Sequence, residues 1–332
     1  MYDFEPNEQQ QKIIDWAKNG EGNMMVKARA GTGKTTTIEM IVQNISNPSL
    51  VICFNKHIAE ELLQRNNLER FVTKKSEGGL GLTQIRTSNS LGNATLLQDL
   101  EGKGFKTKDG KFLQENKIYQ VFRDFLVDYC RKCQQPFPEG KLQSAVLRDL
   151  KTAYDKTKNR FCNAEEESAE IVIVEGRLFP SIPLSEEDIE NYPILPWGEI
   201  VSKSILEGVK IYEERGIYDF SDQLFIPVYK NLNLPYWIAR YTDTILVDEA
   251  QDLTPLQIAF LQKINSARKM YKKTTTDARY CFVGDDRQAI YSFIGATGGI
   301  FDRIKTKFET PELPLTICYR CSKSVIKFVQ EI

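Results

Sequence analysis

The chain has 332 residues, a length that suggests roughly two domains and is ample for a buried core. Hydrophobic residues make up 41% and charged residues 27% of it, and this ordinary globular usage excludes wholesale disorder and collagen-like repeats. The 44 Lys and Arg residues almost balance the 45 Asp and Glu residues. The net charge of −1 therefore gives no sign of a strongly basic nucleic-acid binder, although a local basic face is compatible with it.

The lack of a targeting signal in this sequence and its cysteine usage both indicate an intracellular protein. No run of ~18 apolar residues occurs, and the first residues, MYDFEPNEQQQ, lack the basic-then-apolar order of a signal peptide. Seven cysteines, an odd number in a long chain, favour reduced thiols. We therefore expect a cytoplasmic protein, or one of the nucleoid or of a eukaryotic nucleus, without a membrane partner.

Short apolar runs alternate with helical segments along most of the chain. We expect buried strands at 24–26, 49–54, 83–87, 244–247, 280–283 and 313–317. Pro255, directly after Thr254, fits the first turn of the helix that follows the fourth of these strands. This alternation predicts an α/β fold with a parallel sheet and helices on both faces.

The strand pattern disappears between about residues 98 and 199, where helical spacing predicts a mainly helical insertion into the sheet domain. Residues 101–160 carry 14 Lys and Arg against 8 Asp and Glu, a balance of +6. Residues 161–200 carry one Arg against 10 Asp and Glu, a balance of −9. The basic half is compatible with phosphate contacts and equally with a solvated helix face.

A glycine-rich loop, ARAGTGKT, lies between the first predicted strand and a helical segment. Its glycines let backbone N–H groups crowd around phosphate oxygens, and the helix N-terminus adds a favourable dipole. We expect Lys34 to reach the β and γ phosphates of a nucleotide and the Thr35 hydroxyl to bind Mg²⁺; a plain glycine-rich turn is the alternative. The expected nucleotide-binding residues here are Ala28, Arg29, Ala30, Gly31, Thr32, Gly33, Lys34, Thr35 and Thr36.

A second chemical signal is the segment TILVDEAQD at 244–252, which places two acidic residues at the C-terminal end of a buried strand. Asp248 is expected to hold Mg²⁺, and Glu249 to orient or deprotonate the attacking water. The alternative is an acidic cluster that only caps a helix. The phosphate loop upstream favours a site that hydrolyses a nucleoside triphosphate.

Residues 283–296, VGDDRQAIYSFIGA, together with the two segments above, resemble the motifs of superfamily 1 DNA helicases of the UvrD/Rep type, nearest their F-box helicase and phage branches. Further segments resemble other motifs of that family in the same order, at 4–10, 53–59, 87–92, 218–224 and 315–321. The resemblance covers about 1–97 and 205–332, and the insertion matches only in position and helical character.

The resemblance implies a RecA-like P-loop NTPase domain made of residues 1–97 and 205–312, interrupted by a helical insertion at 98–204. Residues 313–332 would begin a second RecA-like motor domain, which is otherwise absent. We therefore expect a fragment of a longer helicase, whose site a C-terminal half completes. A naturally short relative that needs a partner protein is the alternative.

The resemblance also implies roles for single residues. Gln10 would read adenine, Tyr319 would stack on it, Gln288 would sense the γ-phosphate, and Arg320 would act as an arginine finger beside the catalytic Lys34 and Glu249. The expected DNA-contacting residues are Phe54, Asn55, Lys56, Thr87, Asn89, Tyr291 and Phe293. Burial in the core is the rival interpretation for the three aromatic residues among them.

Several positions depart from the family pattern. Asn89 stands where relatives usually have His, Cys318 replaces the usual Asn, and Ile294 takes the place of a common Arg. Two CxxC pairs, at 130–133 and 318–321, have the spacing of metal ligands. The second pair lies inside a helicase-like motif, so ordinary structural cysteines are the favoured interpretation.

We expect from these residues and this resemblance an ATP-dependent 3′-to-5′ DNA helicase of which this chain is the N-terminal portion. ATP and Mg²⁺ are the implied substrate and ion, and single-stranded DNA or DNA with a 3′ tail is the implied partner. Two alternatives stay open: a DNA-stimulated ATPase that translocates without separating strands, and a non-catalytic DNA-binding module gated by nucleotide. The oligomeric state stays open as well.

Overall fold

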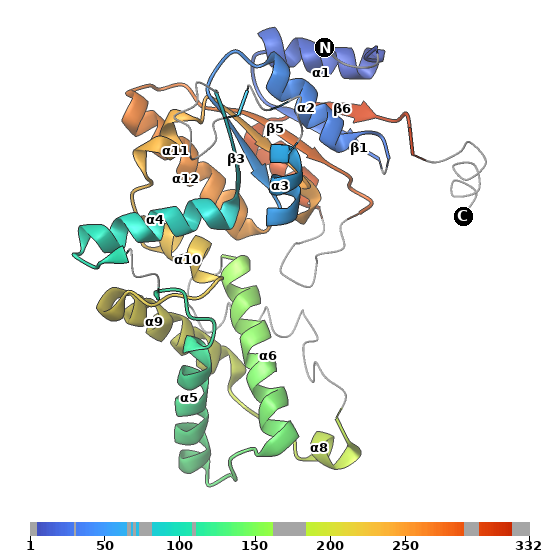
Figure 1. The fold of residues 1–332 in the computed structure, drawn as a ribbon. Coiled ribbons are helices and arrows are strands. Elements are labelled where there is room, and N and C mark those ends of the chain that lie inside the picture. The colour runs from blue at the N-terminus through green and yellow to red at the C-terminus, as the bar shows by residue number, and fades with distance from the viewer. Residues whose placement is uncertain are drawn as a thin grey trace.

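The computed structural model describes residues 5–29, 31–64, 68, 71–72, 82–107, 111–161, 184–288 and 299–320. They form a sheet body and a helical body that meet around helices α4 and α10 (Figure 1). α4 spans Ser88–Gly102 and α10 spans Asp222–Tyr229.

A six-stranded sheet in the order β3-β2-β4-β5-β1-β6 is the centre of the first body. All five strand pairings are parallel, as the alternation of apolar runs and helices predicts. The strands are β1 (Met24–Ala28), β2 (Ser49–Cys53), β3 (Thr83–Thr87), β4 (Thr244–Val247), β5 (Arg279–Gly284) and β6 (Glu312–Leu315). The predicted α/β fold is therefore confirmed.

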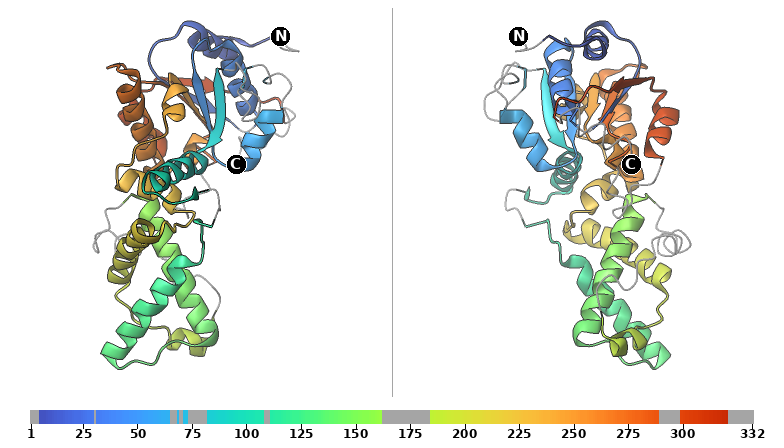
Figure 2. Two further views of the ribbon diagram at one scale, coloured as in Figure 1. Left: turned by 60° about the vertical axis from the view of Figure 1, so that its left-hand side comes forward. Right: turned by 90° about the vertical axis from the view of Figure 1, so that its right-hand side faces the viewer.

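Side chains alternate between the two faces of this sheet, and each face is covered by helices (Figure 2). In β1, Met24 and Val26 belong to one buried cluster, whereas Met25 belongs to the other. The first cluster packs on α1 (Glu8–Asn19), α2 (Lys34–Asn44) and α3 (Lys56–Gln64). The second packs on α4, α10, α11 (Tyr236–Arg240), α12 (Pro255–Lys272) and α13 (Ile300–Phe308).

The start of α12 follows its sequence closely. The Thr254 side chain accepts a hydrogen bond from the Gln257 backbone, the Gln257 side chain accepts one from the Thr254 backbone, and Pro255 occupies the first turn as predicted. These hydrogen bonds and Pro255 fix where α12 begins, directly after the acidic segment that follows β4.

The helical body contains α5 (Lys117–Cys133), α6 (Gly140–Asn159), the short α8 (Glu186–Glu190) and α9 (Trp197–Arg215). Phe122 of α5 and Tyr154 of α6 meet edge to face with ring centroids 5.8 Å apart. The expected domain boundaries at 97/98 and 204/205 fall inside the continuous helices α4 and α9. The boundary at 312/313 falls inside β6, which pairs with β1 of the same sheet.

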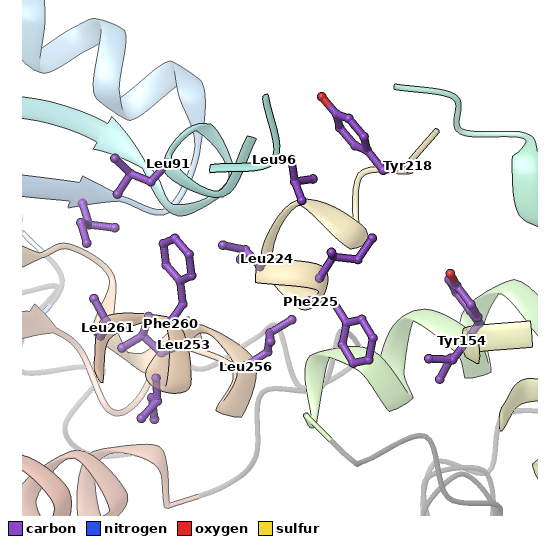
Figure 3. Close-up of a cluster of buried hydrophobic side chains, with 14 of the residues drawn as sticks. Leu91, Leu96, Tyr154, Tyr218, Leu224, Phe225, Leu253, Leu256, Phe260 and Leu261 are labelled. Atoms are coloured by element: carbon purple, nitrogen blue, oxygen red, sulfur yellow. The ribbon is translucent and has the colours of Figure 1, made fainter. Parts of the chain in front are cut away.

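Helix α10 connects the two bodies through buried side chains (Figure 3). Its Leu224 and Phe225 lie between Leu91 and Leu96 of α4 and the apolar face of α12, with Tyr154 of α6 on the far side of Phe225. The core is therefore continuous from the sheet to the helical body. Every helix among the described residues is too short or too polar to span a lipid bilayer.

Candidate nucleotide site and nucleic-acid groove

The phosphate loop connects β1 to α2 through two glycines in the left-handed region, Gly31 with φ 75° and Gly33 with φ 87°. The Thr32 hydroxyl donates to the Arg29 carbonyl oxygen at 2.7 Å and tightens the loop. Among the described residues, no side chain caps the N-terminus of α2 at Gly33. The first N–H groups of this helix therefore remain available for an anion.

The segment after β6 closes over this loop. The Tyr319 backbone N–H donates to the Gly31 carbonyl oxygen at 2.9 Å. A Cβ atom on Gly31 would lie 2.7 Å from Cβ of Arg320 and 2.9 Å from Sγ of Cys318. The structure thus brings Tyr319 and Arg320, both exposed, to the phosphate loop although they are almost 300 residues away in sequence.

The acidic pair after β4 faces the same loop. Lys34 Nζ donates to Oε2 of Glu249 at 2.6 Å, and the two side chains are 14% and 24% exposed. Burial and the neighbouring Glu249 carboxylate raise the pKa of Asp248 to about 6. Burial and Glu249 likewise raise the pKa of Asp252 to about 7. Excess negative charge is therefore concentrated where a cation and phosphates are expected.

The donors present fit Mg²⁺ bound together with a phosphate. Asp248 is buried at the carboxyl end of β4, and Thr35 lies in the first turn of α2. In the described part of the chain, no group of three or more His, Cys, Asp or Glu side chains is arranged to hold a metal on its own. Mg²⁺ is usually held by one or two protein ligands, with phosphate oxygens and water completing the octahedron.

The turn after β5 carries Gln288, whose backbone N–H donates to the Asp285 carbonyl oxygen at 3.0 Å. Arg29 of the phosphate loop reaches this turn, with Nη1 2.8 Å from Oδ1 of Asp286 and 3.6 Å from Oδ1 of Asp285. Arg29, a predicted nucleotide-binding residue, thus has a guanidinium group paired with this turn. The phosphate loop therefore contacts the turn that carries Gln288, through Asp285 and Asp286.

The start of α1 lies next to Tyr319. Gln10 is buried, and its side-chain oxygen accepts from the Asn7 backbone N–H at 3.0 Å in a reciprocal cap. The Asn7 side chain donates to the Tyr319 hydroxyl at 2.7 Å, and Gln9 pairs with Thr316. Sequence reasoning missed Asn7 and Gln9. The Asn-x-x-Gln spacing of a capping box was the available signal.

A groove of about 980 Å³ lies between the sheet body and the helical body. Its lining contains the expected DNA-contacting residues Phe54, Asn55, Lys56, Thr87 and Asn89. The other expected contacts, Tyr291 and Phe293, lie outside the described residues, as do Ala30 of the phosphate loop and the Ile294 departure.

Local capping explains why these residues share one wall. Asn55 Oδ1 accepts from the Ile58 backbone N–H at 2.9 Å just before α3, and Thr87 caps α4 in a reciprocal bond with Ser90. Asn55 follows the carboxyl end of β2, and Thr87 is the last residue of the neighbouring parallel strand β3. Parallel strands place such ends along one edge of a sheet, where ligands of α/β proteins bind.

The opposite wall comes from the helical body and from the segment that returns from it. Phe220 of that segment lines the groove and is 56% exposed. Its carbonyl oxygen accepts a hydrogen bond from Asn89 Nδ2 at 3.3 Å. Sequence reasoning missed Phe220, although it lies in the family-like segment 218–224. Lys151 of α6 also lines the groove and is paired with Asp155.

The basic excess of residues 101–160 is partly used inside the protein. Lys158 is fully buried, with Nζ 2.5 Å from Oδ1 of Asp222 and 2.7 Å from Oγ of Ser221. Lys117 pairs with Asp222 as well. These two ammonium groups do not contribute to a solvated basic face, so that interpretation of the charge count is wrong for them.

The cysteines lie in separate places. Cys53 and Cys281 are buried in strands, where burial raises the pKa of each thiol. Cys130 and Cys133 end α5 in the helical body, whereas Cys318 lies against the phosphate loop. The described cysteines are all free thiols.

Comparison with known proteins agrees with this geometry. A model of the UvrD/REP helicase N-terminal domain matches residues 6–309. The "Probable DNA helicase II homolog" of Mycoplasma genitalium is 27% identical over 98% of this chain and 42% of its own length. The "F-box DNA helicase protein 1" of Schizosaccharomyces pombe is 25% identical over 96% of this chain and 32% of its own length.

The "ATP-dependent DNA helicase Rep" of Buchnera aphidicola is 24% identical over 97% of this chain and 42% of its own length. The chain thus spans about two fifths of the length of such relatives, or less. The family match extends over most of the chain and includes the phosphate loop, the acidic pair and the groove residues. The chain belongs to the UvrD/REP helicase N-terminal domain family.

Proposed function

We propose that the protein carrying this chain is an ATP-dependent DNA helicase that couples ATP hydrolysis to 3′-to-5′ movement on single-stranded DNA. The contact between Lys34 and Glu249 is the observation that carries this proposal, because it joins the phosphate loop to the acidic strand end at 2.6 Å. The groove that opens at the same edge of the sheet supports a nucleic-acid partner. The polarity rests on the family resemblance.

Lys34 and Glu249 neutralise one another without nucleotide. Incoming phosphates compete for the Lys34 ammonium, which releases the Glu249 carboxylate to accept a proton from the attacking water. Thr35 and Asp248 would hold Mg²⁺, which neutralises phosphate charge when it is bound. Arg320, beside Gly31, offers a cation for the charge that develops on the γ-phosphate.

Adenine would lie near the start of α1 and Tyr319. The hydrogen bond from Asn7 holds the Tyr319 ring at this place, and the buried Gln10 fixes the helix start from which Asn7 projects. We propose that Tyr319 stacks on the base and that Gln10 acts on it either directly or through this cap.

Single-stranded DNA would occupy the groove. Phe54 and Phe220 offer π faces to bases from opposite walls, while Asn55, Lys56 and Asn89 offer polar contacts to the backbone. A second motor domain, supplied by a further part of the protein or by a partner, would complete the nucleotide site. DNA of the cytoplasm, nucleoid or nucleus would be the partner in the cell.

Strand displacement measured beside ATP turnover tests this function. On duplexes with a single-stranded tail, the intact protein should unwind those with a 3′ tail and spare those with a 5′ tail, and Lys34→Ala should abolish both activities. DNA-stimulated ATP turnover without strand displacement would indicate a translocase and not a helicase. ATP binding without turnover would leave a nucleotide-gated binding module.

A further inference from the structure

The Gln251 side chain connects two parts of the nucleotide site. It is buried, with 3% of its surface exposed, in the short 3₁₀ helix Ala250–Asp252 that follows Glu249. Its Nε2 donates to Oε2 of Glu249 at 2.7 Å. Its Oε1 accepts from the Asp285 backbone N–H at 2.9 Å, at the end of β5. One amide therefore bridges the hydrolytic carboxylate and the turn that carries Gln288.

Close packing maintains this bridge. A Cβ atom on Gly284 would collide with Oε1 of Gln251 and lie 3.0 Å from the Ala250 nitrogen. The buried Asp285 then organises the turn, because Oδ1 accepts from the Arg287 backbone N–H at 3.1 Å and its carbonyl oxygen accepts from that of Gln288. A displacement of the turn must therefore move Gln251.

Glu249 has two donors on the same oxygen, Lys34 and Gln251. In the function proposed above, the Lys34 ammonium leaves Glu249 to bind the phosphates of ATP. Of these two donors, Gln251 then still contacts Glu249. A hydrogen bond from a neutral amide donor holds the orientation of a carboxylate when the cationic donor has left. The amide is thus suited to hold Glu249 during hydrolysis.

We propose that Gln251 is a positioning residue that sets Glu249 in register with the Gln288 turn, so that changes in the turn alter the rate of ATP hydrolysis. This inference rests on the proposed ATPase function. Gln251 would act through Glu249 and not through its own contact with nucleotide or DNA. We therefore expect a substitution of Gln251 to change kcat and to leave the affinity for both ligands unchanged.

Gln251→Glu in the intact protein is the direct test. The variant has nearly the same shape and keeps the acceptor toward Asp285, but it loses the donor and faces Glu249 with a like charge. We expect kcat of DNA-stimulated turnover to fall on the order of 10- to 100-fold. KM for ATP and Kd for a fluorescent single-stranded oligonucleotide should stay within about twofold. Gln262→Glu, on the exposed face of α12, is the matched control and should match wild type.

Gly284→Ala attacks the same bridge from the other side. If both variants act through one contact, Gly284→Ala combined with Gln251→Ala should be no slower than the slower single variant. Wild-type kcat in Gln251→Glu, or a loss seen only in KM, would overturn the positioning role and leave the proposed function intact. Absence of ATP turnover in the intact wild-type protein would overturn both.

Discussion

Glu249 holds a left-handed backbone conformation, φ 48° and ψ 48°, which residues other than glycine rarely adopt. Such strain costs on the order of 1–3 kcal/mol and persists where the surroundings enforce it. Here Lys34 and Gln251 both donate to the side chain, and the Asp248 carboxylate accepts from the Glu249 backbone N–H at 2.9 Å. Strain of this kind fits a side chain whose position serves chemistry rather than stability.

A comparison of Glu249→Gly with Glu249→Ala measures this strain. Both variants lose the carboxylate and its contacts, but only glycine adopts φ 48° freely. We expect the glycine variant to be more stable than the alanine variant by about 1 kcal/mol in chemical denaturation. Equal stability, or a more stable alanine variant, would contradict the presence of strain at this residue.

Alanine substitutions at Gly31 and at Gly22 distinguish backbone strain from a steric requirement at the phosphate loop. Their φ values are close, 75° and 73°, but a Cβ on Gly31 would meet Arg320 and Cys318, whereas one on Gly22 would meet nothing within 4 Å. Alanine should cost both variants on the order of 1 kcal/mol of stability. Only Gly31→Ala should also weaken ATP binding, measured with a fluorescent ATP analogue, and a similar loss in Gly22→Ala would refute the steric account.

At the scale of elements, the design repeats one unit: a buried parallel strand followed by a polar turn that begins a helix. Gly33 and Asn55 occupy this position after β1 and β2, and Thr87, the last residue of β3, caps α4. The central strands could be predicted from sequence, because β2 and β4 are short, largely apolar runs buried on both faces, whereas β3 and the edge strand β6 are more polar and less buried. The turns supply the polar groups, so their residues also line the nucleotide site and the groove.

Other features of the site could not be predicted in this way. Gln10 serves the helix cap that its spacing equally encodes, and sequence alone does not decide between capping and base contact. Lys158 has the helical spacing of a surface lysine, and only the tertiary fold brings Asp222 to it. Phe220 lies in a connecting segment without periodicity, so its exposure into the groove depends on how the two bodies are arranged.

The Lys158 ion pair is expected to hold α6 to the start of α10. Lys158→Met removes the ammonium and leaves Asp222 and Asp219 with less compensation, which should cost about 3–5 kcal/mol of unfolding free energy. Lys210→Met is the control, since Lys210 is exposed and pairs with Glu207 at 3.5 Å, and it should cost less than about 1 kcal/mol. Comparable losses in both variants would contradict the structural role of the buried pair.

The same cluster predicts a pH dependence. Burial alone would raise the pKa of Asp219, but Lys158, Lys117 and Lys151 outweigh it and hold that pKa below its usual value. A depressed folded-state pKa stabilises the protein above the unfolded value of ~3.9, and the stabilisation is lost as the pH falls below it. Chemical denaturation from pH 6 downward should therefore show a steeper acid loss for wild type than for Lys158→Met. Parallel curves would argue against this linkage.

In the whole molecule, the residues that line the groove come from the sheet body and from the helical body. These two bodies lie next to each other (Figure 1). The continuous core through α10 keeps the two walls in register (Figure 3). The phosphate loop and one wall of the groove both lie at the carboxyl ends of strands in the same parallel sheet, so the two sites share one rigid support.

Phe220→Ala tests whether this groove binds single-stranded DNA. Loss of one base-stacking side chain should weaken oligonucleotide binding by about 1–3 kcal/mol, with ATP affinity unchanged. Tyr236→Ala is a suitable control, because Tyr236 is 61% exposed and lies outside the groove lining. Fluorescence anisotropy with a labelled oligonucleotide measures the difference. Equal affinities of the two variants for the oligonucleotide would contradict DNA binding in the groove.

The decisive measurement is ATP hydrolysis by the intact protein, with and without single-stranded DNA, compared with that of Glu249→Gln. The neutral side chain keeps the shape of Glu249 but cannot accept a proton from water. We expect DNA-stimulated turnover in wild type and its loss in Glu249→Gln, with ATP binding retained in the variant and dependent on Lys34. Turnover that survives in Glu249→Gln, or a wild-type protein that does not bind ATP, would contradict it.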